Sequence, residues 1–171
     1  LRERDLSAHR EQFIAKADQQ HEWWRALGCT APSAGSLLFS LFAYENRAIS
    51  DLLRAWEVSE RPICCLVPTS QTLSAIARYA GRSLAVGDVW QRGALEQTRY
   101  DQLLWLCDLN FVRGEDSFVR AQWAARPLVW QLYPQQDGAH LAKLEAFLAL
   151  YGATLPPDCR VALHSLSTAW N

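Results

Sequence analysis

The sequence predicts an α/β fold, with a Rossmann-like, mostly parallel sheet and flanking helices. Short apolar runs alternate with segments of about ten residues that have helical spacing, a pattern typical of βαβ units. The apolar runs are continuous, as in strands that are covered on both faces. The chain has 171 residues and 50% of them are hydrophobic, which suits one domain with its own core.

Residues 1–28 are predicted to form one helix. Leu6, Phe13 and Ile14 recur near helical spacing, and Gly28 is a suitable C-cap. The first half of this segment is highly charged, and the chain begins at Leu1 rather than at a methionine. From the residues alone we expect this segment to be a connector or an outer helix, and residues 29–171 to form the Rossmann-like domain.

Strands and helices are predicted to alternate through the rest of the chain, after a loop at residues 29–36. The strands are bounded by Pro, Gly and Asp, and several helices end at Gly. The predicted strands are residues 37–44, 62–68, 83–90 (the weakest), 108–113 and 127–133. The predicted helices are residues 47–56, 70–81, 97–107, 115–125, 137–152 and 158–171.

Composition argues against several classes of function. The formal net charge is −1 with mixed signs, so we expect no nucleic-acid partner. No apolar run approaches the roughly 20 residues of a membrane span. The five cysteines include no CxxC pair and the four histidines lack ligand spacing, so we expect reduced structural thiols in a cytoplasmic protein, with no metal and no cofactor. Cys64 and Cys65, adjacent in a strand, should point to opposite faces.

The turn "RGEDS" after the predicted strand 108–113 is the most unusual feature of the sequence. It places Arg113, Glu115, Asp116 and Ser117 between two apolar runs, at the strand end where ligands bind in open α/β sheets. Gly114 permits a sharp turn, and Asp116 or Ser117 can cap the next helix. The free N–H groups of that helix would form an anion site.

The composition of this turn suits a nucleotide diphosphate with its ribose. Ser117 can donate to a phosphate oxygen, whereas Glu115 repels phosphate and suits a sugar hydroxyl. Arg113 could neutralise the carboxylates or meet the diphosphate. A solvated helix N-terminus, with acids placed there for the helix dipole, is the alternative. Neither a GxGxxG nor a P-loop fingerprint is present.

Polar residues also follow two other predicted strands. Tyr44 and Glu45 end the first strand, and Tyr133 and Gln135 end the last. Parallel strands bring these positions to the same sheet edge as Arg113. An aromatic at a strand end is more often a core or rim residue, so it is the convergence of several such residues that favours a site.

Several of these segments resemble the elongation factor P arginine rhamnosyltransferase family. The block from Leu103 to Leu148, "LLWLCDLNFVRGEDSFVRAQWAARPLVWQLYPQQDGAHLAKLEAFL", carries most of the likeness, and "SLFAYEN" and "QTRYDQLLW" match in order. "RERDL" resembles the segment that joins the family's two halves, which implies that residues 1–28 are a connector helix from an N-terminal domain that this sequence does not contain. The resemblance implies the C-terminal, donor-binding half of a GT-B glycosyltransferase, which transfers rhamnose from dTDP-β-L-rhamnose to an arginine of elongation factor P with inversion.

The resemblance also implies roles for individual residues. Glu115 would accept a hydrogen bond from the deoxyribose hydroxyl. Asp116 and Ser117 would hold the diphosphate through backbone N–H groups and the Ser117 hydroxyl. Arg113 would brace the loop, and Tyr44 and Tyr133 would line the phosphate pocket.

Three further features follow from the family. Phe42 and Gln97 would lie near the donor or its base. The family's aromatic three residues before Gln97 is Ala94 here. An aspartate pair in the N-terminal domain would supply the base, so no catalytic residue is expected in this chain, and the chain alone should be inactive.

Two alternatives remain open at this point. One is a nucleotide-binding module without transfer activity. The other is a different GT-B enzyme, such as a nucleotide-sugar epimerase. The nucleotide that binds would separate them, since dTDP favours the rhamnosyltransferase, UDP favours the epimerase, and no binding favours an interaction role.

Overall fold

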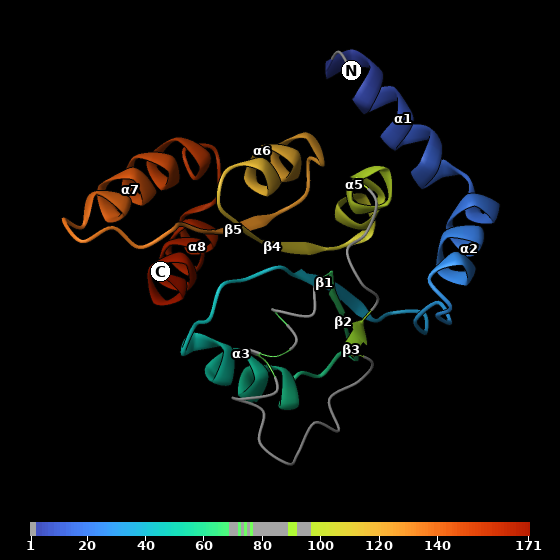
Figure 1. Ribbon diagram of the computed structural model, residues 1–171, viewed down its shortest axis with the longest axis horizontal. Helices are drawn as coiled ribbons and strands as arrows, with labels where there is room; N and C mark the ends of the chain where they lie inside the picture. The colour runs from blue at the N-terminus through green and yellow to red at the C-terminus, as the bar shows by residue number, and fades with distance from the viewer. Residues whose placement is uncertain (1–2, 69–71, 73, 75, 77–88, 92–96) are drawn as a thin grey trace.

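The protein folds around a sheet of five parallel strands, seen in the computed structural model of Figure 1, which describes residues 3–68, 72, 74, 76, 89–91 and 97–171. The strand order is β3-β2-β1-β4-β5. Every neighbouring pair runs parallel. The strands are β1 (Leu37–Leu41), β2 (Ile63–Val67), β3 (Val89–Gln91), β4 (Leu109–Arg113) and β5 (Leu128–Gln131). The predicted α/β fold with a parallel sheet is confirmed.

Strand β1 lies at the centre of the sheet, where the direction of winding reverses. The chain first builds β2 and β3 on one side of β1 and then adds β4 and β5 on the other. A buried polar pair joins β1 to β4, because Ser40 Oγ donates to Asn110 Oδ1 at 2.6 Å in the register where these residues face each other. Asn110 Nδ2 donates to the Leu104 carbonyl at 3.0 Å. A register slip would leave these groups buried without partners, so the pair fixes the β1–β4 junction.

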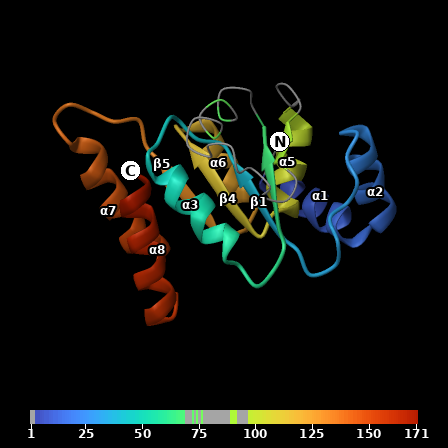
Figure 2. The same cartoon turned by 90° about the horizontal axis from the view of Figure 1, so that it is seen from below.

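Helices cover both faces of the sheet, as Figures 1 and 2 show. One face carries α5 and α6 with α1, α2 and α7 around them, and the other carries α3 and α8. The helices are α1 (Glu3–Ala15), α2 (Ala17–Ala26), α3 (Ala48–Glu57), α5 (Gln97–Leu106), α6 (Asp116–Trp123), α7 (Ala139–Tyr151) and α8 (Pro157–Trp170).

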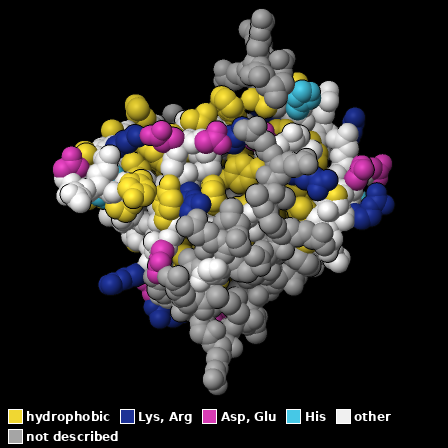
Figure 3. Space-filling model, in the orientation of Figure 1, with side chains coloured by type: hydrophobic (Ala, Val, Ile, Leu, Met, Phe, Trp, Pro, Cys, Tyr) yellow, Lys and Arg dark blue, Asp and Glu magenta, His cyan; other side chains and the backbone are white. Residues whose placement is uncertain are grey.

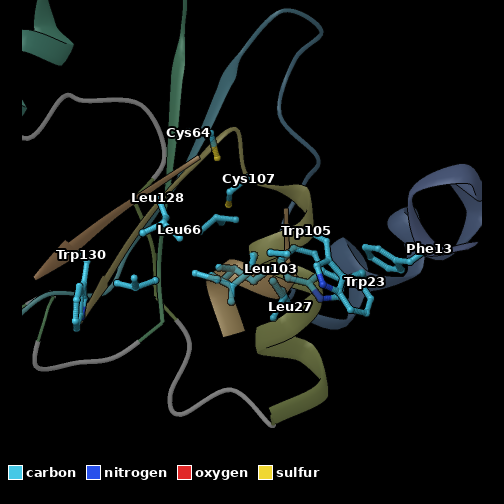
Figure 4. Packing of buried hydrophobic residues seen from close by; sticks show 14 of the residues in the cluster. Phe13, Trp23, Leu27, Cys64, Leu66, Leu103, Trp105, Cys107, Leu128 and Trp130 are labelled. Carbon is cyan, nitrogen blue, oxygen red and sulfur yellow. The ribbon is translucent and has the colours of Figure 1, made fainter. Parts of the chain in front are cut away.

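Each face has its own hydrophobic core, and successive strand residues alternate between the two. Cys64 and Leu66 pack on the α5–α6 face, which Figure 4 shows from close by, whereas Cys65 and Val67 pack on the α3–α8 face. The prediction that Cys64 and Cys65 point to opposite faces is confirmed. This two-sided burial explains why the strands read as continuous apolar runs.

The prediction of a single helix over residues 1–28 is wrong. Lys16 has extended backbone angles (φ −108°, ψ 97°) and separates α1 from α2. Gln20 Nε2 donates to the Ile14 carbonyl at 2.8 Å and so satisfies the end of α1. The bend lets α1 and α2 both bury aromatic residues, since Phe13 is 4% exposed and lies 5.8 Å from the Trp105 ring, and Trp23 is 4% exposed. That these helices connect to a further domain stays a prediction.

One further predicted strand is shorter in the structure, and two predicted elements are described only in part. The first strand ends at Leu41 rather than at residue 44, so residues 42–44 form a loop beyond it. Most of the predicted helix 70–81 and residues 83–88 of the predicted third strand lie outside the described residues. Among the described residues on the face that Figure 3 shows, charged side chains of both signs are interspersed.

Candidate functional site

A pocket of about 330 Å³ lies beyond the carboxyl ends of β4 and β5. Ligands of open α/β sheets bind at this edge, near the point where the strand order reverses. The loop after β1, the turn after β4 and the segment after β5 contribute to it, and α7 closes one side. Its lining residues are Tyr44, Gly114, Glu115, Trp130, Leu132, Tyr133, Gln135, His140 and Lys143.

Arg113 joins the turn after β4 to the loop after β1. Its guanidinium carbon lies 4.3 Å from the centre of the Phe42 ring and 4.5 Å from that of Tyr44. Arg113 Nη1 also donates to the Ala43 carbonyl at 3.3 Å. Partial burial lowers the pKa of Arg113, but a guanidinium stays protonated in proteins. The Arg113 guanidinium therefore lies between the Phe42 and Tyr44 rings and the Ala43 carbonyl, behind the residues that line the pocket.

Gly114 forms the sharp turn between β4 and α6 at the edge of the pocket. Its φ is +63°, and a Cβ at this position would lie 3.1 Å from the Tyr44 hydroxyl, so both backbone and space require glycine. Its carbonyl accepts a 2.6 Å hydrogen bond from Trp130 Nε1, and its N–H donates to the Gln131 carbonyl at 3.1 Å. The turn is thereby tied to β5 at two points.

The Ser117 side chain is buried and closes this turn from the helix side. Its hydroxyl accepts a 3.1 Å hydrogen bond from the Arg113 N–H and donates a short one to the Arg113 carbonyl. A hydroxyl has only one proton to donate. A bond from Ser117 to a phosphate would therefore require it to give up the Arg113 carbonyl, and its phosphate role stays a prediction.

We expect Ser117→Ala to lower the free energy of unfolding by about 1–2 kcal/mol, because the partly buried Arg113 N–H loses the Ser117 hydroxyl as its acceptor. Ser50→Ala is the matched control. Ser50 also bonds to a carbonyl three residues earlier, but at the surface, so its loss should cost less than about 0.5 kcal/mol. Urea unfolding of both variants checks this. Equal stabilities of the two variants would contradict the role of Ser117 in closing the turn.

The N-terminus of α6 is open to a ligand. Glu115 occupies the N-cap position, and no side chain caps the helix. The prediction that Asp116 or Ser117 caps it is therefore wrong. Asp116 Oδ2 instead accepts a 3.1 Å bond from Arg120 Nε, and Arg120 Nη1 is anchored on Asp101 at 2.8 Å. The Asp116 carboxylate is thus held along the helix, which leaves the first-turn N–H groups without partners inside the helix and suited to an anion.

Glu115 stands at the rim of the pocket, with its side chain 85% exposed. Lys143 Nζ, from α7, lies 3.5 Å from Glu115 Oε1 and 5.4 Å from the centre of the Trp130 ring. Tyr133 stands beside them, and its ring meets that of Tyr44 edge to face at 5.8 Å. An acidic group, a cation and two phenols thus surround one opening, which suits a polar ligand with hydroxyl and anionic groups.

The structure brings three of the eight predicted site residues, Tyr44, Glu115 and Tyr133, into the pocket lining. Phe42, Arg113, Asp116 and Ser117 adjoin it without lining it. Phe42 instead meets the Tyr100 ring edge to face at 6.0 Å. Gln97 begins α5, but its side chain lies outside the described part of the structure, as does Ala94.

Sequence reasoning missed four residues that line the pocket, Trp130, Leu132, His140 and Lys143, and the last two of these carry ionisable side chains. A lysine between apolar residues of a helix normally faces solvent, and only the fold places α7 beside the start of α6. His140 Nδ1 accepts a 3.1 Å hydrogen bond from the Gln135 N–H and so shapes the loop that precedes α7. The feature of the sequence that could have pointed to His140 is its place in the first turn of a predicted helix.

Within the described residues, no group of three or more His, Cys, Asp or Glu side chains is arranged to hold a metal ion. No helix in the same part of the chain has the length and apolarity needed to cross a bilayer.

Comparisons with known proteins agree on one family. Residues 1–171 match the family model described as "Elongation-Factor P (EF-P) rhamnosyltransferase EarP". A protein-arginine rhamnosyltransferase of Pseudomonas aeruginosa is 47% identical across the whole chain, and one of Shewanella oneidensis is 35% identical across 99% of it. The chain spans 48% and 46% of these two relatives, which is about half of their length.

A solved structure is similar to the whole chain as well, with a TM-score of 0.83 and 41% identity. It comes from work on the "structural basis for EarP-mediated arginine glycosylation of translation elongation factor EF-P", and the chain covers 57% of it.

Proposed function

Because the chain belongs to the EF-P rhamnosyltransferase EarP family, we propose that it is the donor-binding half of an inverting GT-B glycosyltransferase. The donor is dTDP-β-L-rhamnose, and the acceptor is an arginine of elongation factor P in the bacterial cytosol. One observation carries the proposal from fold to site. The uncapped N-terminus of α6 opens beside Glu115 and two tyrosines, at the sheet edge where nucleotides bind.

The diphosphate and the deoxyribose of the donor each have matching groups at this site. The diphosphate meets the first-turn N–H groups of α6, which carry partial positive charge and need no metal. The deoxyribose hydroxyl donates to the Glu115 carboxylate. Tyr44 and Tyr133 supply phenol hydroxyls toward the phosphates. Arg113 braces Tyr44 from behind through its ring contact at 4.5 Å.

The proposed reaction is a displacement at the anomeric carbon. A guanidinium nitrogen of the acceptor attacks C1 of rhamnose, the C1–O bond to the diphosphate breaks, and dTDP leaves with the bonding electrons. The nitrogen loses a proton to a base on the other half of the enzyme. This chain contributes by stabilising the charge that develops on the leaving diphosphate, which is the role of preorganised N–H groups in such sites.

A calorimetric titration of the chain with dTDP and with UDP tests this proposal. We expect dTDP to bind more tightly, because the family's donor carries thymine and a 2′-deoxy sugar. Tighter binding of UDP would favour a nucleotide-sugar epimerase instead. Binding of neither nucleotide would favour an interaction module and would overturn the proposal.

A further inference from the structure

The loop at residues 42–44 is held in place by hydrogen bonds from three other segments. Thr72 Oγ1 accepts from the Ala43 N–H at 3.3 Å and donates to the Ala43 carbonyl at 3.1 Å. Arg113 Nη1 donates to the same carbonyl. The Tyr44 N–H donates to Gln131 Oε1 at 2.8 Å. Each bond fixes a backbone group that the sheet no longer pairs, because β1 has already ended at Leu41.

Gln131 contacts both turns that build the pocket. It is the last residue of β5 and is 6% exposed. Its backbone carbonyl accepts from the Gly114 N–H at 3.1 Å, while its side chain reaches Tyr44. Since β4 lies between β5 and β1 in the sheet, the side chain passes over the end of β4 to reach the loop after β1.

A buried amide at this position is costly unless it is hydrogen-bonded, and an apolar residue would be the ordinary choice at the end of a buried strand. Its acceptor is matched to one donor, the Tyr44 N–H. The ring of Tyr44 in turn covers Arg113 and meets Tyr133 edge to face. The position of Gln131 therefore sets the position of two aromatic groups at the pocket.

We infer that Gln131 is a positioning residue for the donor pocket, because its side-chain oxygen fixes the Tyr44 backbone while its main chain fixes Gly114. This inference rests on the proposed function for its consequence in ligand binding. The Tyr44 side of the pocket is thereby formed before the donor arrives, so the donor does not have to order it on binding.

Gln131→Met tests this, since methionine keeps the length of the side chain and removes the acceptor. Amide hydrogen exchange by NMR should show faster exchange of the Tyr44 N–H, with the Phe42 N–H, which bonds to the Phe111 carbonyl at 3.0 Å, unchanged. Affinity for dTDP should fall roughly tenfold, the factor that corresponds to one lost hydrogen bond. Gln131→Glu keeps an acceptor and should keep the Tyr44 N–H protected.

Gln136→Met is the matched control, because Gln136 is exposed and does not line the pocket. It should change neither Tyr44 exchange nor dTDP affinity. Equal acceleration at Tyr44 and Phe42 in Gln131→Met would mean general loosening of the sheet and would overturn the inference, as would unchanged Tyr44 exchange. If the unsubstituted chain fails to bind dTDP, the proposed function is wrong, and Tyr44 exchange alone still decides whether Gln131 holds the loop.

Discussion

The purified chain should bind dTDP-rhamnose and yet leave elongation factor P unmodified. An acceptor guanidinium is protonated at neutral pH, so the transfer needs a base that is held beside it. Glu115, the carboxylate in the lining of the pocket, is paired with Lys143, and Asp116 is paired with Arg120. Positioning of the acceptor in line with the donor supplies a further large part of the rate, and that surface is expected on the other half of the enzyme.

Intact-mass spectrometry of elongation factor P checks this prediction. No rhamnose-sized gain in mass should occur with the chain and donor alone, whereas a longer protein that also carries the N-terminal half should produce the gain. The same incubation without donor is the control. Modification by the chain alone would show that the base and the acceptor surface are on this half, and that the proposed division of labour is wrong.

Replacement of Glu115 by alanine should weaken dTDP binding by about 1.5–3 kcal/mol, which is the range for a hydrogen bond to a charged group. This corresponds to roughly a tenfold to a hundredfold loss of affinity. Glu115→Gln keeps an acceptor and should lose less. The fold should be unaffected, because an exposed ion pair such as Glu115–Lys143 contributes little to stability.

Calorimetry with dTDP measures the loss, and Glu145→Ala is the matched control. Glu145 is also an exposed carboxylate with a nitrogen-bearing side chain beside it, His164 Nε2 at 3.0 Å, but it does not line the pocket. Its replacement should leave dTDP affinity unchanged. A folded Glu115→Ala variant that binds dTDP as tightly as the unsubstituted chain would refute the proposed contact with the deoxyribose.

The fold could be predicted from the sequence because each strand of a buried parallel sheet is apolar along its own length. Strands covered on both faces must be apolar throughout, so "ICCLV" and "LNFV" indicate strands without reference to their neighbours. The break at Lys16 could not be predicted in this way. It depends on the contact of Phe13 in α1 with Trp105 in α5 and on the burial of Trp23 of α2 in the same hydrophobic cluster, which no local pattern records.

The site could be predicted in part, for a similar reason. Glu115, Tyr44 and Tyr133 follow strand ends, and the carboxyl ends of parallel strands meet at one edge. Lys143 lies in the middle of a helix, and Gln131 is a strand residue whose side chain passes over the end of a neighbouring strand. Their roles depend on contacts between elements that are far apart in the sequence: α7 with the start of α6 for Lys143, and β5 with the loop after β1 for Gln131. The capping predicted for Ser117 was wrong because its hydroxyl found a partner in the turn behind it.

We propose that dTDP binds at the pocket beyond β4 and β5, and mapping of amide chemical shifts by NMR tests this binding site most directly. Addition of dTDP should move the amide signals of Gly114, Glu115 and Asp116 most, together with those near Tyr44 and Tyr133. A second pocket of about 330 Å³, lined by residues of α1, α2 and α5 that include Trp23 and Arg99, provides an internal comparison. Shifts that gather at that second pocket, or no shifts at all, would contradict the account.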